Sequence, residues 1–167
     1  YQEVTGVQTC ALPISDGESI AEDMENNGLE YHSGWDCCVP QIFWTYVVFY
    51  DPDAFPGEKP DSMADFFDVE KFPGKRGIHT WATGIIEKAM VADGVEPNAV
   101  PTVLEKQTGA LDRAFAKLDT IKDHVVFWSS GSKPLELVKS GEVVMAIAYN
   151  GRVGAANLAE GENFEYI

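Results

Sequence analysis

Hydrophobic and polar positions alternate in two ways along the second half of the chain, and together they predict an α/β fold. Short apolar runs rich in β-branched residues indicate buried strands at residues 77–80, 124–128 and 143–148. Apolar residues spaced three and four apart indicate helices at about residues 84–93, 109–121 and 133–139. Because strands and helices take turns, we expect parallel pairing with right-handed crossovers.

Capping and turn signals refine this pattern. Asp61 and Ser62 are expected to cap a short helix that ends at Phe67, and Pro73-Gly74 favours a turn with positive φ. Lys75 and Arg76, which follow the turn, are expected to be solvated. The clearest amphipathic helix is that at 109–121, whose predicted buried stripe is Leu111, Ala114, Phe115, Leu118 and Ile121.

The organising segment is the strand at 143–148, which runs into Tyr149-Asn-Gly-Arg152 and then a helical stretch at 153–159. Ligands of open α/β sheets bind just outside the carboxyl ends of the strands. The loops at 81–84, 129–132 and 149–152 are therefore expected to converge on one rim. Its candidate ligand-binding residues are Trp81, Thr83, Ser130, Tyr149, Asn150 and Arg152. The alternative is a strand that ends in an exposed Tyr and a solvated Arg.

Composition and charge exclude several classes of function. The 167 residues suit one domain, and 45% of them are hydrophobic, which is enough for an ordinary core. The net charge of −15 argues against binding to nucleic acid or to anionic membrane surfaces. No apolar run in the sequence is long enough to span a bilayer.

No constellation for catalysis or metal binding is visible in the sequence. The three histidines are scattered, no Cys/His spacing fits zinc, and neither a phosphate loop nor a nucleophile elbow occurs. Cys37-Cys38 leaves two interpretations: one Cys is buried and the other pairs elsewhere, or one of them is a nucleophile. The nucleophile needs a base beside the thiol, and the sequence supplies no obvious one.

The first residues do not read as the start of a secreted protein. Residues 4–14 have neither a basic n-region nor an apolar h-region, so they are not a signal peptide. They resemble the conceptual translation of a sequencing-adapter oligonucleotide, and we expect residues 1–14 to be non-native. Residues 15–27 are acidic and compatible with a short helix.

Three motifs resemble the spermidine/putrescine-type solute-binding proteins of bacterial ABC transporters. They are Asp65-Phe-Phe-Asp-Val-Glu-Lys-Phe-Pro-Gly-Lys-Arg-Gly77, Ala110-Leu-Asp-Arg-Ala-Phe-Ala-Lys-Leu-Asp119 and the segment 142–157. The resemblance runs in one order from about Leu29 to Ile167. It implies a bilobal fold of the type II periplasmic-binding-protein kind, with residues 15–48 as the tail of lobe one and the crossover strand, and 49–167 as lobe two. Trp44 and Tyr46 would then lie beside the interlobe cleft, or else be core aromatics.

The resemblance also implies a function and, through its departures, a ligand. Polyamine-binding relatives place an aromatic where Tyr149 stands, and some place an acid where Arg152 stands. A basic residue there would repel a diamine and attract a carboxylate. We therefore expect a monomeric, periplasmic, non-enzymatic receptor, without cofactor, that binds a small amino-acid-like zwitterion or anion and delivers it to a membrane permease. The alternatives are a polyamine receptor and an enzyme on the same bilobal fold, as in thiaminase-type enzymes.

Overall fold

The computed structural model describes residues 44–167, and residues 46–167 belong to one compact unit. Its strands are β1 (Tyr46–Tyr50), β2 (Arg76–His79), β3 (Val125–Trp128), β4 (Met145–Tyr149) and β5 (Glu165–Tyr166). Its α-helices are α2 (Met63–Phe67), α3 (Ile85–Ala92), α4 (Val100–Lys106), α5 (Ala110–Asp119), α6 (Lys133–Lys139) and α7 (Asn150–Ala155). The predictions made for residues 1–43, including the helix at 15–27 and the state of Cys37 and Cys38, lie outside the described residues.

The five strands form one mixed sheet in the order β3-β2-β4-β1-β5. β2 pairs in parallel with β3 and with β4, as the alternating pattern predicts. β1 runs antiparallel to β4 and to β5, so the expectation of parallel pairing holds only for the three strands that follow one another through helices. The predicted α/β class is confirmed, with a sheet of mixed rather than uniform direction.

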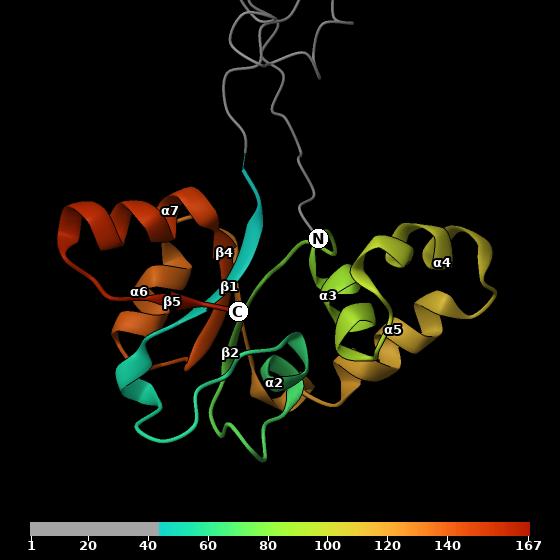
Figure 1. Cartoon of the computed structure of the whole chain (residues 1–167), viewed down its shortest axis with the longest axis horizontal. Helices are drawn as coiled ribbons and strands as arrows, with labels where there is room; N and C mark the ends of the chain where they lie inside the picture. Colours follow the sequence, from blue (N-terminus) through green and yellow to red (C-terminus); the bar gives the residue numbers. More distant parts are fainter. Residues whose placement is uncertain (1–43) are drawn as a thin grey trace, which may run out of the picture. The chain divides into compact units, whose positions relative to one another are not determined.

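Helices cover both faces of the sheet (Figure 1). Alternate residues of β4 divide between the faces: Met145 and Ile147 join a core with α2, α3 and α5, whereas Ala146 and Ala148 join a second core with α6 and α7. β1 divides in the same way, because successive side chains of a strand point to opposite faces. The continuous apolar run of β4 is thus the signature of a strand buried on both sides.

Most of the helices predicted from periodicity are present, with small shifts at their ends. α6 has the predicted bounds, and α3 buries the four predicted residues Ile85, Ile86, Ala89 and Met90. Ser62 caps α2 in a reciprocal capping box with Asp65. α7 begins at Asn150, directly after β4, and continues into a π-helical turn at Ala156–Glu160, so the predicted start at residue 153 is three residues late.

The buried stripe predicted for α5 is only partly right. Ala114 and Ile121 are buried, but Leu111 and Phe115 remain 54% and 55% exposed. α5 contacts α3 and buries the small side chains of Ala110 and Ala114. Phe115 instead lines an open groove together with Ile85 and Ile86 of α3, so it remains partly in solvent. α4 and β5 were not predicted, since neither has a periodic pattern long enough to signal it.

Arg76 corrects the expectation of a solvated turn. Its side chain is completely buried and donates hydrogen bonds to four backbone carbonyl groups. Nε bonds Phe66 O at 2.7 Å, Nη1 bonds Gly74 O at 2.8 Å, and Nη2 bonds Phe72 O at 2.7 Å and Asp68 O at 3.1 Å. The predicted positive φ at Gly74 is confirmed at 132°, and it lets the turn fold back so that its carbonyl groups face the guanidinium.

Replacing Arg76 should therefore destabilise the protein far more than replacing its neighbour. In Arg76→Met the four carbonyl groups lose their common donor inside the core, and we expect a loss of about 3 kcal/mol in the free energy of unfolding. Lys75 is exposed, so the matched variant Lys75→Met should stay within about 0.5 kcal/mol of the parent. Urea unfolding measures both, and equal losses would contradict a structural role for the guanidinium.

Asp65 makes stability depend on acid pH. Burial alone would raise the pKa of this carboxyl group, but hydrogen bonds from Ser62, from the backbone of Asp61 and from Lys71 outweigh burial and lower the pKa from 3.8 to about 2. Because the folded pKa is the lower one, the ionised carboxylate stabilises the fold above pH 3.8, and this contribution is lost as the pH falls towards about 2.

Asp65→Asn should accordingly flatten the fall in unfolding free energy across this acid range. We expect the parent to lose about 1–2 kcal/mol more than the variant between the two pH limits, after allowance for the solvent around Lys71. Asp112→Asn removes an exposed carboxylate from α5 and should leave the slope unchanged. Denaturant unfolding at several pH values tests this, and parallel curves for the parent and Asp65→Asn would refute it.

Candidate functional site

The direction of the strands brings four aromatic residues to one edge of the sheet. His79, Trp128 and Tyr149 are the last residues of the parallel strands β2, β3 and β4. Tyr46 is the first residue of the antiparallel strand β1 and stands opposite Tyr149 in the register. We call this edge the rim. It is the place where open α/β sheets bind small molecules.

The rim residues form one connected cluster of rings. Tyr46 and Tyr149 lie with ring centroids 4.9 Å apart, and their hydroxyl groups are 3.2 Å apart. The His79 ring lies 4.3 Å from Trp128 in an edge-to-face contact and 6.3 Å from Tyr46. The cluster offers flat, partly polar surfaces of the kind that line small-molecule sites.

The loop that follows β2 adds Trp81 to the cluster. The Trp81 indole lies 4.6 Å from the His79 ring, yet 61% of the residue is exposed. His79 Nδ1 accepts a hydrogen bond of 2.9 Å from the Trp81 backbone N–H. Burial lowers the pKa of His79, so the ring is neutral at neutral pH. Thr83, from the same loop, is exposed.

Arg152 stands beside Tyr149, in the first turn of α7. A Cβ atom on Gly131 would lie 3.5 Å from Tyr149 Cδ2 and 3.7 Å from Arg152 Nε, so the loop after β3 adjoins both residues. Arg152 is exposed, and within residues 44–167 no carboxylate lies within ion-pair distance of its guanidinium. Arg152 is therefore solvated, as the alternative expectation had it, whereas Tyr149 is half-buried rather than exposed.

A second cation stands at the rim. Lys88, on α3, lies with Nζ 5.8 Å from the centroid of the Tyr46 ring and 3.5 Å from the Tyr46 carbonyl oxygen. The nearby acid Glu87 accepts a hydrogen bond of 2.8 Å from the Gly84 N–H at the start of α3, which occupies one carboxylate oxygen. In a chain of net charge −15, two cations around an aromatic cluster favour an anionic group.

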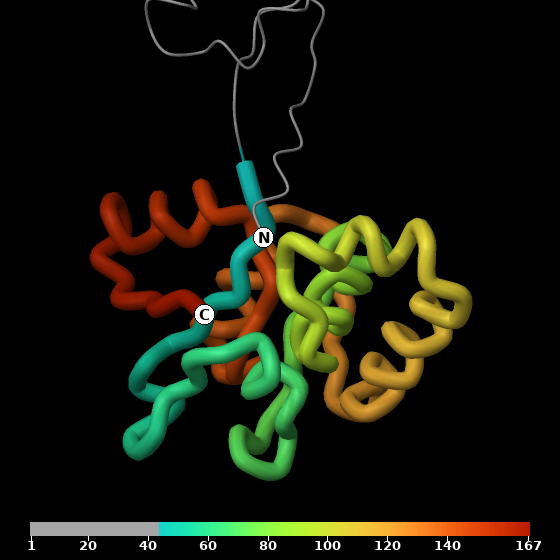
Figure 2. Tube along the Cα trace, turned by 45° about the vertical axis from the view of Figure 1, so that its right-hand side comes forward, coloured from blue at the N-terminus to red at the C-terminus, as the bar shows by residue number. Residues whose placement is uncertain are grey.

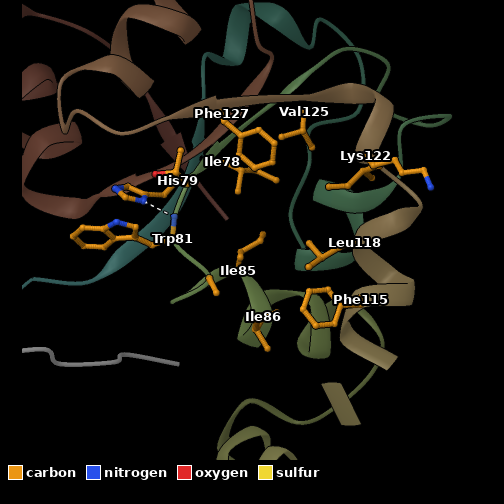
Figure 3. Close-up of a pocket in the computed structure, with 13 residues that line it drawn as sticks. Ile78, His79, Trp81, Ile85, Ile86, Phe115, Leu118, Lys122, Val125 and Phe127 are labelled. Carbon is orange, nitrogen blue, oxygen red and sulfur yellow. Dashed lines mark hydrogen bonds between the residues drawn. The ribbon is translucent and has the colours of Figure 1, made fainter. Parts of the chain in front are cut away.

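An apolar groove lies on the sheet face next to the rim. It has a volume of about 280 Å³, and Figure 3 shows Ile85 and Ile86 of α3 facing Val125 and Phe127 of β3 across it. His79 and Trp81 stand at one end, and Leu118 and Phe115 of α5 form one side. Phe115 and Phe127 both line the groove, and its lining is mainly apolar, with His79, Thr80 and Lys122 as its polar members.

The structure gathers most of the predicted site residues. The three loops predicted to converge do so, with Tyr46, Trp81 and Tyr149 in one cluster and Arg152 beside it. Ser130 is exposed in the loop next to Arg152, with its hydroxyl group 3.4 Å from that of Ser132, and Asn150 begins α7. Trp44 precedes β1, and its place beside a cleft stays a prediction.

Sequence reasoning missed His79, Trp128 and Lys88. His79 and Trp128 hold the same position in their strands as Tyr149 holds in β4, and applying the strand-end rule to every strand would have found both. Lys88 had no such signal, because its nearness to Tyr46 depends on the antiparallel β1. Among residues 44–167, no three His, Cys, Asp or Glu side chains come close enough together to hold a metal ion. Over the same residues, no helix has the length and apolar character needed to cross a membrane.

Comparison with known proteins agrees with the predicted fold class. Residues 6–167 match the family described as bacterial extracellular solute-binding protein. The gamma-aminobutyric acid-binding protein of Pseudomonas aeruginosa is 41% identical over 121 residues, which are 72% of this chain and 34% of that protein. The chain thus spans about a third of the length of this relative.

Solved structures confirm the fold. The PBP MotA of A. tumefaciens B6 in complex with glucopine matches 72% of this chain and 37% of its own, with a TM-score of 0.65 and 38% identity. A structure described as a spermidine/putrescine ABC transporter from Listeria monocytogenes matches 75% of this chain and 36% of its own, with a TM-score of 0.58 and 21% identity. That identity shows the shared fold alone, so the resemblance to solute-binding proteins is confirmed and its narrower polyamine part is not.

The packing of Tyr46 against the loop after β2 can be tested with two glycines. Gly84 and Gly94 have nearly equal positive φ values of 84° and 87°, but only at Gly84 would a Cβ atom collide, 2.9 Å from Tyr46 Cδ2. Gly94→Ala should cost about 1 kcal/mol through the backbone alone, and Gly84→Ala at least about 1 kcal/mol more.

Unfolding free energies and the ring resonances of Tyr46 and Tyr149 give the measurement. We expect the resonances to shift in Gly84→Ala and to stay in place in Gly94→Ala. Identical behaviour of the two variants would show that Tyr46 is not held against this loop.

Proposed function

We propose that this chain, which belongs to the bacterial extracellular solute-binding protein family, supplies one side of the ligand cleft in the solute receptor of an ABC transporter. The proposed ligand is a small zwitterion or anion that resembles an amino acid. Residues 49–167 would be lobe two of a bilobal receptor, and residues 15–48 the tail of lobe one with the crossover strand. The receptor would be periplasmic, monomeric and non-enzymatic, and would deliver its ligand to the permease.

Arg152 carries this proposal. Its guanidinium is exposed at the rim, adjoins Tyr149 and has no ion-pair partner among the described acids. A planar guanidinium binds a carboxylate through two parallel hydrogen bonds, and a diamine offers it nothing to accept those bonds. Tyr46, Tyr149 and Trp81 would cover the apolar part of the ligand, and Ser130, Thr83 and Asn150 would complete its polar contacts.

The relatives support the same class of ligand. Gamma-aminobutyric acid, which gives the Pseudomonas protein its name, carries one carboxylate and one ammonium group. The carboxylate suits Arg152, and the ammonium group suits the faces of the rim aromatics, because the face of a π-system attracts cations. Putrescine and spermidine, the alternative ligands, would place ammonium groups against the two rim cations.

The experiment compares ligands and Arg152 variants on this chain by NMR. Because one side of a cleft covers only part of a ligand, we expect affinities of about millimolar, or −4 kcal/mol. Gamma-aminobutyrate and other ω-amino acids should shift the resonances of Tyr149, Trp81 and Tyr46, whereas putrescine and spermidine should not. Arg152→Ala should abolish the shifts, and Arg152→Lys should restore only part of them.

Arg113→Ala is the matched control, since it removes the same charge from an exposed ion pair with Asp93 on the neighbouring helices. In a longer form that closes the cleft, Arg152→Ala should cost about 2–5 kcal/mol of binding, because the ligand carboxylate is left buried and unpaired. Arg152→Asp should turn the preference towards diamines. Polyamines that bind tightly to the parent while amino acids are ignored would overturn the proposal and favour the polyamine alternative.

A further inference from the structure

We infer that His79 is a positioning residue of the ligand site, which fixes the place of Trp81 at the rim through both its ring and its Nδ1 atom. The inference rests on the proposed function only for the role of Trp81 in ligand contact. The link between the two residues is a property of the chain itself.

Trp81 needs such a support because it stands largely in solvent. With 61% of the residue exposed, the packing around it leaves much of the indole uncovered. The two contacts that orient it come from the same imidazole: the ring contact at 4.6 Å and the hydrogen bond from the Trp81 N–H to Nδ1, drawn as a dashed line in Figure 3. The imidazole is itself 95% buried and held edge-to-face against Trp128. The buried imidazole of His79 therefore fixes the exposed indole of Trp81 relative to the sheet.

The hydrogen bond also determines the proton on the imidazole. A backbone N–H can only donate, so Nδ1 must accept, and the neutral ring carries its proton on Nε2. When His79 gains a second proton, Nδ1 becomes a donor that faces another donor, and the bond to Trp81 is lost. Protonation of His79 thus removes the hydrogen bond that holds Trp81 in place.

The surroundings of His79 oppose this protonation at neutral pH. Burial lowers the pKa of the imidazole below 6.5. The titratable and charged groups on the elements around it are Tyr46 of β1, Glu87 and Lys88 of α3, Lys122 after α5, Tyr149 of β4 and Arg152 of α7. Burial is the cause of the lowered pKa, because a buried site disfavours the charged form of the imidazole. Trp81 is consequently held in place at neutral pH and released only in acid.

The test needs no ligand. In ¹⁵N NMR of the parent chain, the Trp81 amide should shift in one transition with a midpoint below pH 6.5, together with the His79 ring. His79→Asn places an amide oxygen where Nδ1 stands, so the Trp81 amide should stay protected from exchange and show no transition. His79→Leu removes the acceptor, and exchange of the Trp81 amide should become about five- to tenfold faster.

His124→Asn is the control for replacing a histidine by Asn, because His124 is exposed on another segment, and it should leave the Trp81 profile as in the parent. A second arm titrates gamma-aminobutyrate into the same variants at neutral pH. The ligand-induced shift of Trp81 should be kept in part in His79→Asn, which retains the hydrogen bond but not the ring contact, and be lost in His79→Leu, while Tyr149 still responds in both.

The two arms separate the possible failures. A Trp81 amide that ignores both the protonation of His79 and the change to Asn or Leu would overturn the inference, whatever the ligand does. If His79→Leu does not fold, the pH titration of the parent against His79→Asn decides the same question. Gamma-aminobutyrate that shifts no rim signal in any variant would instead contradict the proposed ligand, and the ligand-free titration would still decide whether His79 holds Trp81.

Discussion

The buried guanidinium of Arg76 is the interaction on which the rest of the structure depends. It draws the carbonyl groups of α2 and of the following turn towards β2, so a segment with no strand pairing of its own is fixed to the sheet. β2 in turn pairs with both β3 and β4. Burial lowers the pKa of Arg76 to about 10, so the guanidinium stays charged at neutral pH. An apolar side chain at this position would leave the four carbonyl groups without their hydrogen-bond donor.

The mixed direction of the sheet decides what the rim contains. The parallel strands alone would place His79, Trp128 and Tyr149 at the rim. The antiparallel β1 adds Tyr46, its first residue, which is more than a hundred residues from Tyr149 in sequence. Tyr46 in turn brings Lys88 into reach through its ring and carbonyl oxygen. Tyr46, and with it the neighbouring Lys88, belongs to the rim because β1 runs antiparallel to β4, next to which it lies (Figure 2).

Local signals in the sequence were sufficient for most of the elements but not for their exact ends or for the residues that they contact. Ser62 and Asp65 are three residues apart, so their capping box was readable, and the same holds for the strand-end position of Tyr149 and Arg152. Arg76 follows a turn, which is an ordinary place for a solvated residue, and the sequence does not show its burial because its four acceptors become neighbours only once the turn is folded. Leu111 and Phe115 lie on the apolar face that the helical period predicts. Periodicity identifies this face but does not show whether another element packs against it. The direction of β1 in the sheet depends on tertiary pairing, and so does the position of Lys88 beside Tyr46.

The position of β3 in the sheet has a consequence for how the protein behaves in solution. In the part of the chain that the structure describes, β3 is one of the two edge strands, and Phe127 on it is 67% exposed. An outer strand with an exposed aromatic is a template on which further strands can assemble. At neutral pH the charge of −15 keeps the molecules apart, but near the isoelectric point of about 4.4 that repulsion vanishes. The colloidal stability of this fold therefore comes from its many Asp and Glu side chains. Mildly acidic pH removes it before the core unfolds.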